Sequence, residues 1–192
     1  MQLLRCTLFL FYVVGNKWKE LKPVEVWDLY DKAKNLLGKQ HIRGEVIPQG
    51  EYHLVVEIFT INKDGKLLLT QRDAAKTYPL LWECTGGSVT SGETSLIGAV
   101  RELEEETELI ASPHELHHIG TIRNEHYFLD SYIWKSKKKL ELSDLRLQAG
   151  EVCGAQFAAL EECDEMNACE LIVPKVWERY KVYSDVVSQW TK

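Results

Sequence analysis

A run of glycines that leads into a helix rich in carboxylates is the feature that most constrains this chain of 192 residues. Between Thr94 and Leu109 the apolar residues recur at helical spacing, at Leu96, Ala99, Val100 and Leu103. This spacing predicts an amphipathic helix with one face against a core. Glycines at positions 86, 87 and 92 precede the helix and would let a phosphate or a metal approach the main chain.

A second face of the predicted helix carries Glu102, Glu105 and Glu106, at positions i, i+3 and i+4. Like charges this close repel one another, so a merely solvated helix would gain nothing from the arrangement. Hard divalent cations prefer oxygen ligands, and these three carboxylates could supply them within one helical turn. The pattern therefore favours a metal-binding helix, while the alternative of a solvated acidic helix explains neither the glycines nor Arg101.

At these residues the chain resembles the Nudix hydrolases. Their signature has fixed positions that correspond here to Gly87, Glu93, Arg101, Glu102, Leu103, Glu105, Glu106 and Leu109. The one departure is Glu108, which stands where the family has a glycine. That glycine usually ends the helix in a left-handed conformation, which glutamate adopts only with strain.

The resemblance implies a set of metal ligands and a reaction. Glu102, Glu105 and Glu106 would hold Mg2+, or Mn2+ in its place, with the carbonyl of Gly86 as a further ligand. These glutamates and Arg101 form the catalytic set, in which Arg101 pairs with Glu93 to hold the loop against the helix. One of the glutamates, or a carboxylate outside the signature, would take the proton from the attacking water.

The resemblance extends upstream, to the branch of the superfamily that includes isopentenyl-diphosphate isomerase. It covers about residues 24 to 160 and is carried by His53, an Asp-Gly turn, Arg72, Lys76 and Trp82. By this resemblance, Arg72 and Lys76 bind the diphosphate of the substrate. Glu151 joins them at the substrate and is the candidate for the carboxylate outside the signature.

Three functions are compatible with these residues. The first is a Mg2+-dependent hydrolase that cleaves the diphosphate linkage of a nucleoside diphosphate joined to another moiety. The second is an isomerase of isopentenyl diphosphate, which we disfavour because Gly86 falls where that reaction needs a cysteine and Ser88 where it needs a histidine. The third is a non-catalytic binding module, which would typically have lost glutamates that this chain keeps.

The rest of the chain predicts one α/β domain over residues 24–192, with residues 1–23 as an N-terminal extension or strand. The resemblance implies an α/β/α sandwich with a mixed sheet. A hairpin is expected from Glu51–Phe59 and Leu67–Arg72 around an Asp-Gly turn. Further strands are expected at Val24–Tyr30 and Gly44–Ile47, with a turn around Asp31–Gly38, and at His117–Ile122, Tyr127–Trp134 and Val152–Phe157.

The C-terminal segment predicts a helix with an aromatic stripe. Pro174 suits its first turn, and the stripe comprises Val173, Val176, Trp177, Tyr180, Tyr183, Val187 and Trp190. Such a stripe is more often core than a platform for a nucleobase. A subunit interface is the other packing role, and it would make the protein a homodimer.

Composition limits the partners and the compartment. A formal net charge of -6 argues against a nucleic-acid partner, whose binding surface would be basic. Five scattered cysteines suit reduced thiols in a cytoplasmic protein, and we expect Cys84 to be a packed residue. The apolar run Thr7–Val14 is too short to span a membrane, and no small-residue cleavage site follows it.

Overall fold

Strand β5 (His53–Ile61) runs through the centre of the main sheet in the computed structural model, which describes residues 11–14, 17–20 and 24–192. The remaining strands are β1 (Phe11–Val14), β2 (Lys17–Glu20), β3 (Val26–Tyr30), β4 (Leu36–Ile42), β6 (Leu67–Arg72), β7 (Trp82–Glu83), β8 (Thr85–Ser88), β9 (His117–Arg123), β10 (Tyr127–Lys135) and β11 (Val152–Ala158). The helices are α1 (Ser95–Thr107), α2 (Leu160–Ala168) and α3 (Pro174–Trp190), with short 3-10 turns at Pro113–Glu115 and Leu142–Asp144.

The main sheet is mixed and follows the order β11-β6-β5-β10-β9. Strand β10 lies parallel to β5, in register from Tyr127 opposite His53 to Lys135 opposite Ile61. The short strands β7 and β8 pair with β6 and β5 respectively. Strands β1 and β2 pair with each other, as do β3 and β4, so these two hairpins form separate sheets.

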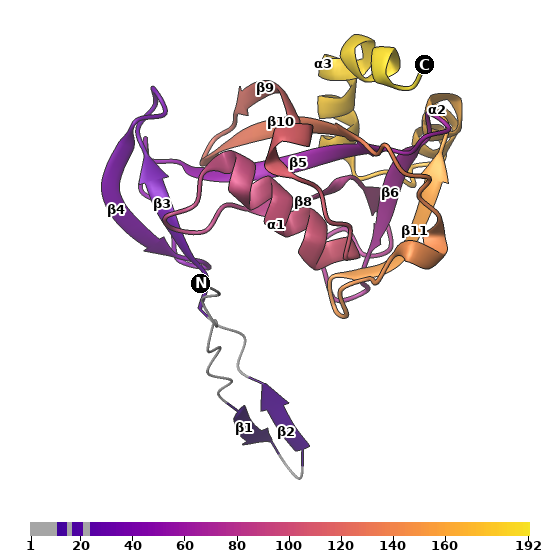
Figure 1. Cartoon of the computed structure of the whole chain (residues 1–192). Helices are drawn as coiled ribbons and strands as arrows, with labels where there is room; N and C mark the ends of the chain where they lie inside the picture. Colours follow the sequence, from indigo (N-terminus) through magenta and orange to yellow (C-terminus); the bar gives the residue numbers. More distant parts are fainter. Residues whose placement is uncertain (1–10, 15–16, 21–23) are drawn as a thin grey trace, which may run out of the picture.

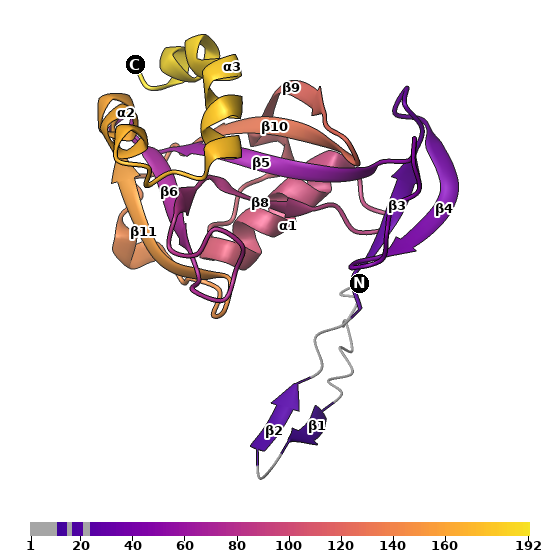
Figure 2. The same cartoon turned by 180° about the vertical axis from the view of Figure 1, so that it is seen from behind.

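Helices cover both faces of the main sheet (Figures 1 and 2). Alternate side chains of β5 point to opposite faces, as the pleat of a strand requires. Val56 and Ile58 pack with Ala99 and Leu103 of α1, while Phe59 and Ile61 belong to the apolar cluster that includes α3. The α/β/α sandwich expected from the sequence is therefore confirmed.

The predicted hairpin of β5 and β6 is joined only at its tip. Ile61 pairs with Leu67, and Asn62 closes the turn by accepting backbone hydrogen bonds from Asp64 and Lys66. Beyond this point β5 and β6 no longer pair with each other. Instead β8 pairs with β5, and β7 pairs with β6. Sequence pattern identified both strands but not the strands that separate them.

The predictions for the segment before β5 need correction. The strand expected at Gly44–Ile47 is wrong: Gly44 has φ +98° and Glu45 donates a backbone hydrogen bond to Ile42, so the chain turns there. The second strand lies earlier, at Leu36–Ile42, and begins within the last residues of the span assigned to a turn. The turn is shorter than expected because the Asp31 side chain accepts hydrogen bonds from the backbone N–H groups of Ala33 and Asn35.

The later elements follow the predictions more closely. Strands β9, β10 and β11 occupy the expected segments. Helix α2 and strands β7 and β8 were not predicted, the last because two glycines in four residues indicate a turn. The apolar run Thr7–Val14, expected to belong to an N-terminal extension or strand, lies partly outside the described residues, and its described part is β1. Within the part of the chain that the structure describes, no helix combines the length and apolarity needed to cross a bilayer.

Helix α3 packs on the sheet through the predicted stripe, and its buried members are Val176, Tyr180, Tyr183 and Val187. One polar contact accompanies this packing. Glu57 of β5 is only 3 % exposed, and Arg179 of α3 donates to its Oε2 over 2.7 Å. The Ser131 hydroxyl donates to the other oxygen of Glu57 over 2.7 Å. Both oxygens of the buried carboxylate are thus bonded.

Helix α1 ends in the left-handed turn that the family resemblance implies. Glu108 follows the last helical residue with φ +56° and donates its backbone N–H to Glu104 over 2.7 Å. This is the left-handed conformation that glycine adopts without strain. The glutamate side chain is exposed, so its strain is not offset by burial.

We expect Arg179→Ala to lower the free energy of unfolding by roughly 3–5 kcal/mol, because it leaves the buried Glu57 carboxylate without its partner charge. Urea unfolding measures the difference. The double variant Glu57→Gln/Arg179→Ala should recover part of the loss, since glutamine carries no charge. A single variant that unfolds at the wild-type urea concentration would mean that the pair contributes little to stability.

We expect Glu108→Gly to raise the free energy of unfolding by roughly 0.5–1 kcal/mol, because glycine relieves the strain at positive φ while its flexible unfolded state offsets part of that gain. Thermal unfolding in excess EDTA measures this without a contribution from bound metal. The catalytic rate should not change, because the exposed side chain points away from the other glutamates. A lower melting temperature would contradict the strain argument.

Candidate active site

Arg101 is the centre of the hydrogen-bond network around the glycine loop and α1. Its Nε donates to Glu93 Oε1 over 2.9 Å, and its Nη2 donates to Glu93 Oε2 over 3.0 Å and to the Ser88 carbonyl over 2.9 Å. Its Nη1 donates to Glu102 over 2.8 Å and to Glu105 over 2.9 Å. One guanidinium thus joins the loop to two glutamates of the helix, and the predicted Arg101–Glu93 pair is present.

Glu93 is held as an anion in this network. Partial burial alone would raise the pKa of Glu93, but hydrogen bonds from Arg101 and Thr90 outweigh burial and lower it. A carboxylate with a lowered pKa keeps its charge at neutral pH, so its bond to the guanidinium is retained.

Glu102 lies directly over strand β8, and Gly87 makes room for it. A Cβ added to Gly87 would lie 2.4 Å from the carboxyl carbon of Glu102. Burial raises the pKa of Glu102 to about 7, with the charges of Glu105 and Glu25 adding to the effect of burial and Arg101 opposing it. A cation beside this carboxylate would reverse the shift and favour its charged form.

Glu106 is the most deeply placed of the three glutamates, with 4 % of its surface exposed. Its Oε2 is buried and has no hydrogen-bond partner among the described residues. Burial raises the pKa of Glu106, and the charges of Glu83 and Glu102 act in the same direction, whereas Lys76 and a backbone hydrogen bond from Gly86 oppose them. A buried, unpartnered carboxylate oxygen is costly unless a positive ligand meets it.

The donor set fits a hard cation, although its members are not yet gathered around one point. Among the described residues, no three acidic, histidine or cysteine side chains form a ready-made metal cluster. Glu105 turns toward Arg101, and its side chain is 46 % exposed. Glu102 and the main chain of Gly86 both act on Glu106, the first through its charge and the second through a backbone hydrogen bond.

The predicted substrate residues come together at one edge of this cluster. Lys76 Nζ lies 2.9 Å from Glu151 Oε2, and the backbone N–H of Asp73 donates to the Glu151 carbonyl over 2.9 Å. Arg72 Nη1 lies 2.6 Å from both carboxylate oxygens of Glu83. We call Arg72 and Lys76 the cationic edge. The charges of Lys76 and Glu83 both act on Glu106, so this edge adjoins the buried glutamate. The structure therefore assembles Arg72, Lys76 and Glu151, while their roles remain predictions.

Sequence reasoning missed three charged residues near the site. Glu83 follows Trp82 in strand β7, and only its place just before the glycine loop could have indicated it. Glu25 and Arg43 form an ion pair at the open end of the β3–β4 hairpin. The charges of Glu102 and Glu151 act on Arg43, so this end of the hairpin faces the carboxylates. No sequence pattern predicts that this ion pair lies next to the carboxylates.

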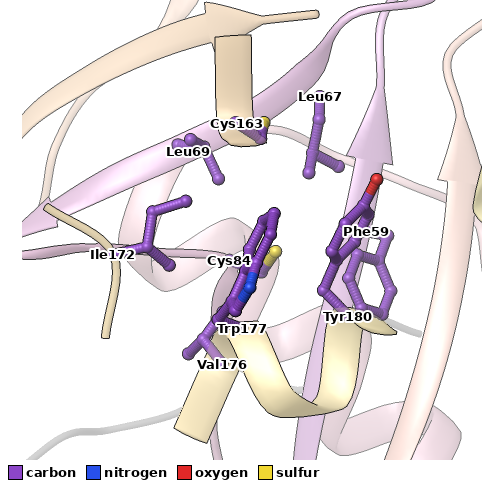
Figure 3. A pocket seen from close by; sticks show the side chains of 9 residues that line it. All are labelled: Phe59, Leu67, Leu69, Cys84, Cys163, Ile172, Val176, Trp177 and Tyr180. Atoms are coloured by element: carbon purple, nitrogen blue, oxygen red, sulfur yellow. The ribbon is translucent and has the colours of Figure 1, made fainter. Parts of the chain in front are cut away.

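Two residues with potential chemistry prove to be packed ones. His53 is buried and stacks on Trp27, with ring centroids 4.1 Å apart, and burial lowers its pKa to about 4. Cys84 lines an apolar pocket toward α3 together with Phe59, Cys163 and Trp177 (Figure 3), and burial raises its pKa. The prediction that Cys84 is a packed residue is confirmed.

Comparison with known proteins identifies the family of the chain. The family model described as the NUDIX domain matches residues 51–181. A Nudix hydrolase of Listeria monocytogenes is 36% identical over 153 residues, covering 79% of this chain and 89% of its own. An isopentenyl-diphosphate Delta-isomerase of Streptomyces avermitilis is 30% identical over 148 residues, covering 73% of this chain and 74% of its own.

The fold is shared with a solved structure. The crystal structure of DR0079 from Deinococcus radiodurans aligns with a TM-score of 0.62 and 21% identity, covering 78% of this chain and 92% of its own. The chain belongs to the Nudix hydrolase family.

Proposed function

We propose that this Nudix hydrolase is a Mg2+-dependent enzyme, with Mn2+ as an alternative metal, that cleaves the diphosphate linkage of a nucleoside diphosphate joined to another moiety. The observation that carries the proposal is the buried Oε2 of Glu106, which has no partner among residues 24–192. It lies beside other carboxylates and next to a cationic edge. This combination fits a cation and a phosphate bound together.

Several groups of the site would hold the metal, and Arg101 would keep them in position. Glu102 and Glu106 would be its carboxylate ligands, with the carbonyl of Gly86 behind them. Glu105 would join them by turning from Arg101, to which it is bonded at 2.9 Å. Divalent cations, when bound, neutralise a diphosphate and lower the pKa of a bound water. Arg101 keeps Glu102 in place throughout, since it also holds the loop at Glu93 and Ser88.

The cationic edge would bind the substrate and the nearby carboxylates would move the proton. Lys76 and Arg72 now bind Glu151 and Glu83, and they would exchange these partners for oxygens of the diphosphate. Once Lys76 binds the diphosphate, Glu151 would accept a proton from the attacking water. The alternative acceptor is one of the box glutamates, which are the signature residues Glu102, Glu105 and Glu106. In either case the leaving phosphate departs from a position next to two cationic side chains.

A panel of substrates tests the proposal. The purified protein is incubated with Mg2+ and, in turn, nucleoside diphosphate sugars, dinucleoside polyphosphates, ADP-ribose and nucleoside triphosphates. We expect hydrolysis of at least one diester of diphosphate, with both phosphorylated products identified by chromatography. Absence of turnover on the whole panel with either Mg2+ or Mn2+ would overturn it.

The isomerase relative favours a second function, which the residues argue against. By alignment, Gly86 stands where the isomerase needs a proton-donating cysteine, and Ser88 stands where it needs a histidine. Cys84 could not substitute, because it is buried among apolar side chains toward α3. The third function, a non-catalytic module, is disfavoured because all the box glutamates are present.

We expect Glu106→Gln to lower turnover at least about 100-fold, because a metal that provides most of the rate loses a charged ligand. Glu105→Gln should cause a loss of the same order. Glu104→Gln is the matched control: it makes the same change in the same turn of α1, at an exposed side chain outside the cluster. Steady-state rates on the best substrate measure all three. Near-wild-type turnover in Glu106→Gln would mean that the metal assignment is wrong.

We also expect no conversion of isopentenyl diphosphate to dimethylallyl diphosphate, since no thiol lies at Gly86. Product analysis with Mg2+ present, against a reaction without enzyme, measures this. Product above that background would contradict the expectation. Loss of such activity in Cys84→Ala would then identify the acid.

A further inference from the structure

The β3–β4 hairpin lies outside residues 51–181, the part of the chain that matches the family model, yet it binds the glycine loop of the site. Asp28 of β3 accepts a hydrogen bond from the Ser91 hydroxyl over 2.7 Å and another from the Gly92 backbone N–H over 2.8 Å. The backbone N–H of Ser91 donates to the Val26 carbonyl over 2.8 Å. Three hydrogen bonds thus connect one strand to two consecutive loop residues.

A residue of the second strand completes this contact. Gln40 lies opposite Asp28 in the hairpin register, and its Nε2 donates to the Ser91 hydroxyl over 2.7 Å. The hydroxyl therefore accepts from one strand and donates to the other, which fixes its orientation. Both side chains of this cross-strand pair meet the same loop residue.

The contact leads directly to the metal-binding glutamates. Gly92 takes φ +84° and is followed by Glu93, whose carboxylate is bonded to Arg101. Arg101 in turn is bonded to Glu102 and Glu105. A shift of the loop at Gly92 would therefore move the guanidinium that positions two of the box glutamates.

The hairpin is itself fixed to the body of the protein along its length. Trp27 stacks on His53 of the central strand at an interplanar angle of 12°. Tyr30 and Tyr52 exchange backbone hydrogen bonds of 2.7 and 2.9 Å. At the turn, Lys34 Nζ lies 2.5 Å from the buried Asp130 carboxylate. An element anchored at both ends can hold the loop in one position.

We propose that Asp28 is a positioning residue of the active site, through which the β3–β4 hairpin fixes the glycine loop and hence the box glutamates. Asp28 acts through Ser91 and Gly92 on Glu93 and Arg101 and touches neither substrate nor metal. The consequence for catalysis rests on the proposed hydrolase function. The consequence for the loop does not.

Hydrogen exchange tests the contact itself. In Asp28→Ala, amides of residues 88–94 should exchange about ten-fold faster, because the loop loses the two hydrogen bonds that Asp28 accepts from Ser91 and Gly92. Asp31→Ala is the matched control: Asp31 lies in the same hairpin, and among the described residues its side chain accepts hydrogen bonds from Ala33 and Asn35 of the turn. Its effect on residues 88–94 should stay within about two-fold. Equal acceleration in both variants would overturn the proposal.

Metal binding and kinetics test the consequence. Titration with Mn2+, followed by the spectroscopic signal of the free ion, should show about three- to ten-fold weaker binding in Asp28→Ala and no change in Asp31→Ala, because only the first displaces Arg101 and Glu102. On the best substrate, kcat should fall roughly ten-fold while KM changes less than about two-fold. Unchanged Mn2+ affinity and kcat, with faster exchange, would limit Asp28 to a structural role and overturn the positioning proposal.

The design separates this proposal from the assignment of function. Failure of the substrate panel would remove the kinetic comparison but would leave the exchange and Mn2+ measurements to decide on Asp28. If Asp28→Ala does not fold, Asp28→Asn takes its place, since it has the same shape and keeps one acceptor oxygen. We expect faster exchange of the Gly92 amide in that variant too, and wild-type exchange would contradict the proposal.

Discussion

The close approach of strands β8 and β5 is the constraint on which the site depends. A Cβ at Gly86 would lie 2.2 Å from the Val56 carbonyl oxygen, so only glycine allows this pairing. The pairing brings Gly87 beneath Glu102 and the main chain of Gly86 to Glu106. With α1 packed across the same strands (Figure 1), Glu102 and Glu106 are largely removed from solvent, whereas Glu105 stays exposed and is bonded to Arg101. The two buried carboxylates are costly as isolated anions.

The burial of these carboxylates also explains where the basic side chains of the site lie. Each basic side chain near the cluster is bonded to a glutamate: Arg101 to Glu93, Arg72 to Glu83 and Lys76 to Glu151. These pairs have different consequences. Arg101 is bonded to five acceptor atoms of the loop and helix and is suited to hold geometry, whereas the described contacts of the Lys76 side chain comprise one ion pair, to Glu151. Under the function proposed above, that single ion pair is the one exchanged for the diphosphate of the substrate.

The sequence predicted the elements whose signal is local. The helix and the face that carries its glutamates follow from residue spacing, whereas the Arg101–Glu93 pair and the left-handed Glu108 were expected from the family resemblance. Residues that reach the site from elsewhere in the chain were missed, such as Glu25, Arg43 and Asp28. Their positions depend on how the β3–β4 hairpin packs, and a single sequence carries no spacing for that contact. Strand β8 was missed for a different reason, because glycines that permit close pairing also resemble a turn.

The parallel pairing of β10 with β5 has a consequence for how the chain reaches this structure. His53 and Tyr127 are partners in the register, and the whole glycine loop and helix α1 lie between them in the chain. Contacts between segments so far apart form slowly, because a long loop must close before they contribute free energy. The part of the core that β10 contributes against α1, including Phe128 and Tyr132, is therefore assembled late, in the step that completes the sheet. A nascent chain that has emerged only as far as α1 would hold its acidic helix without the pairing that completes the sheet beneath it.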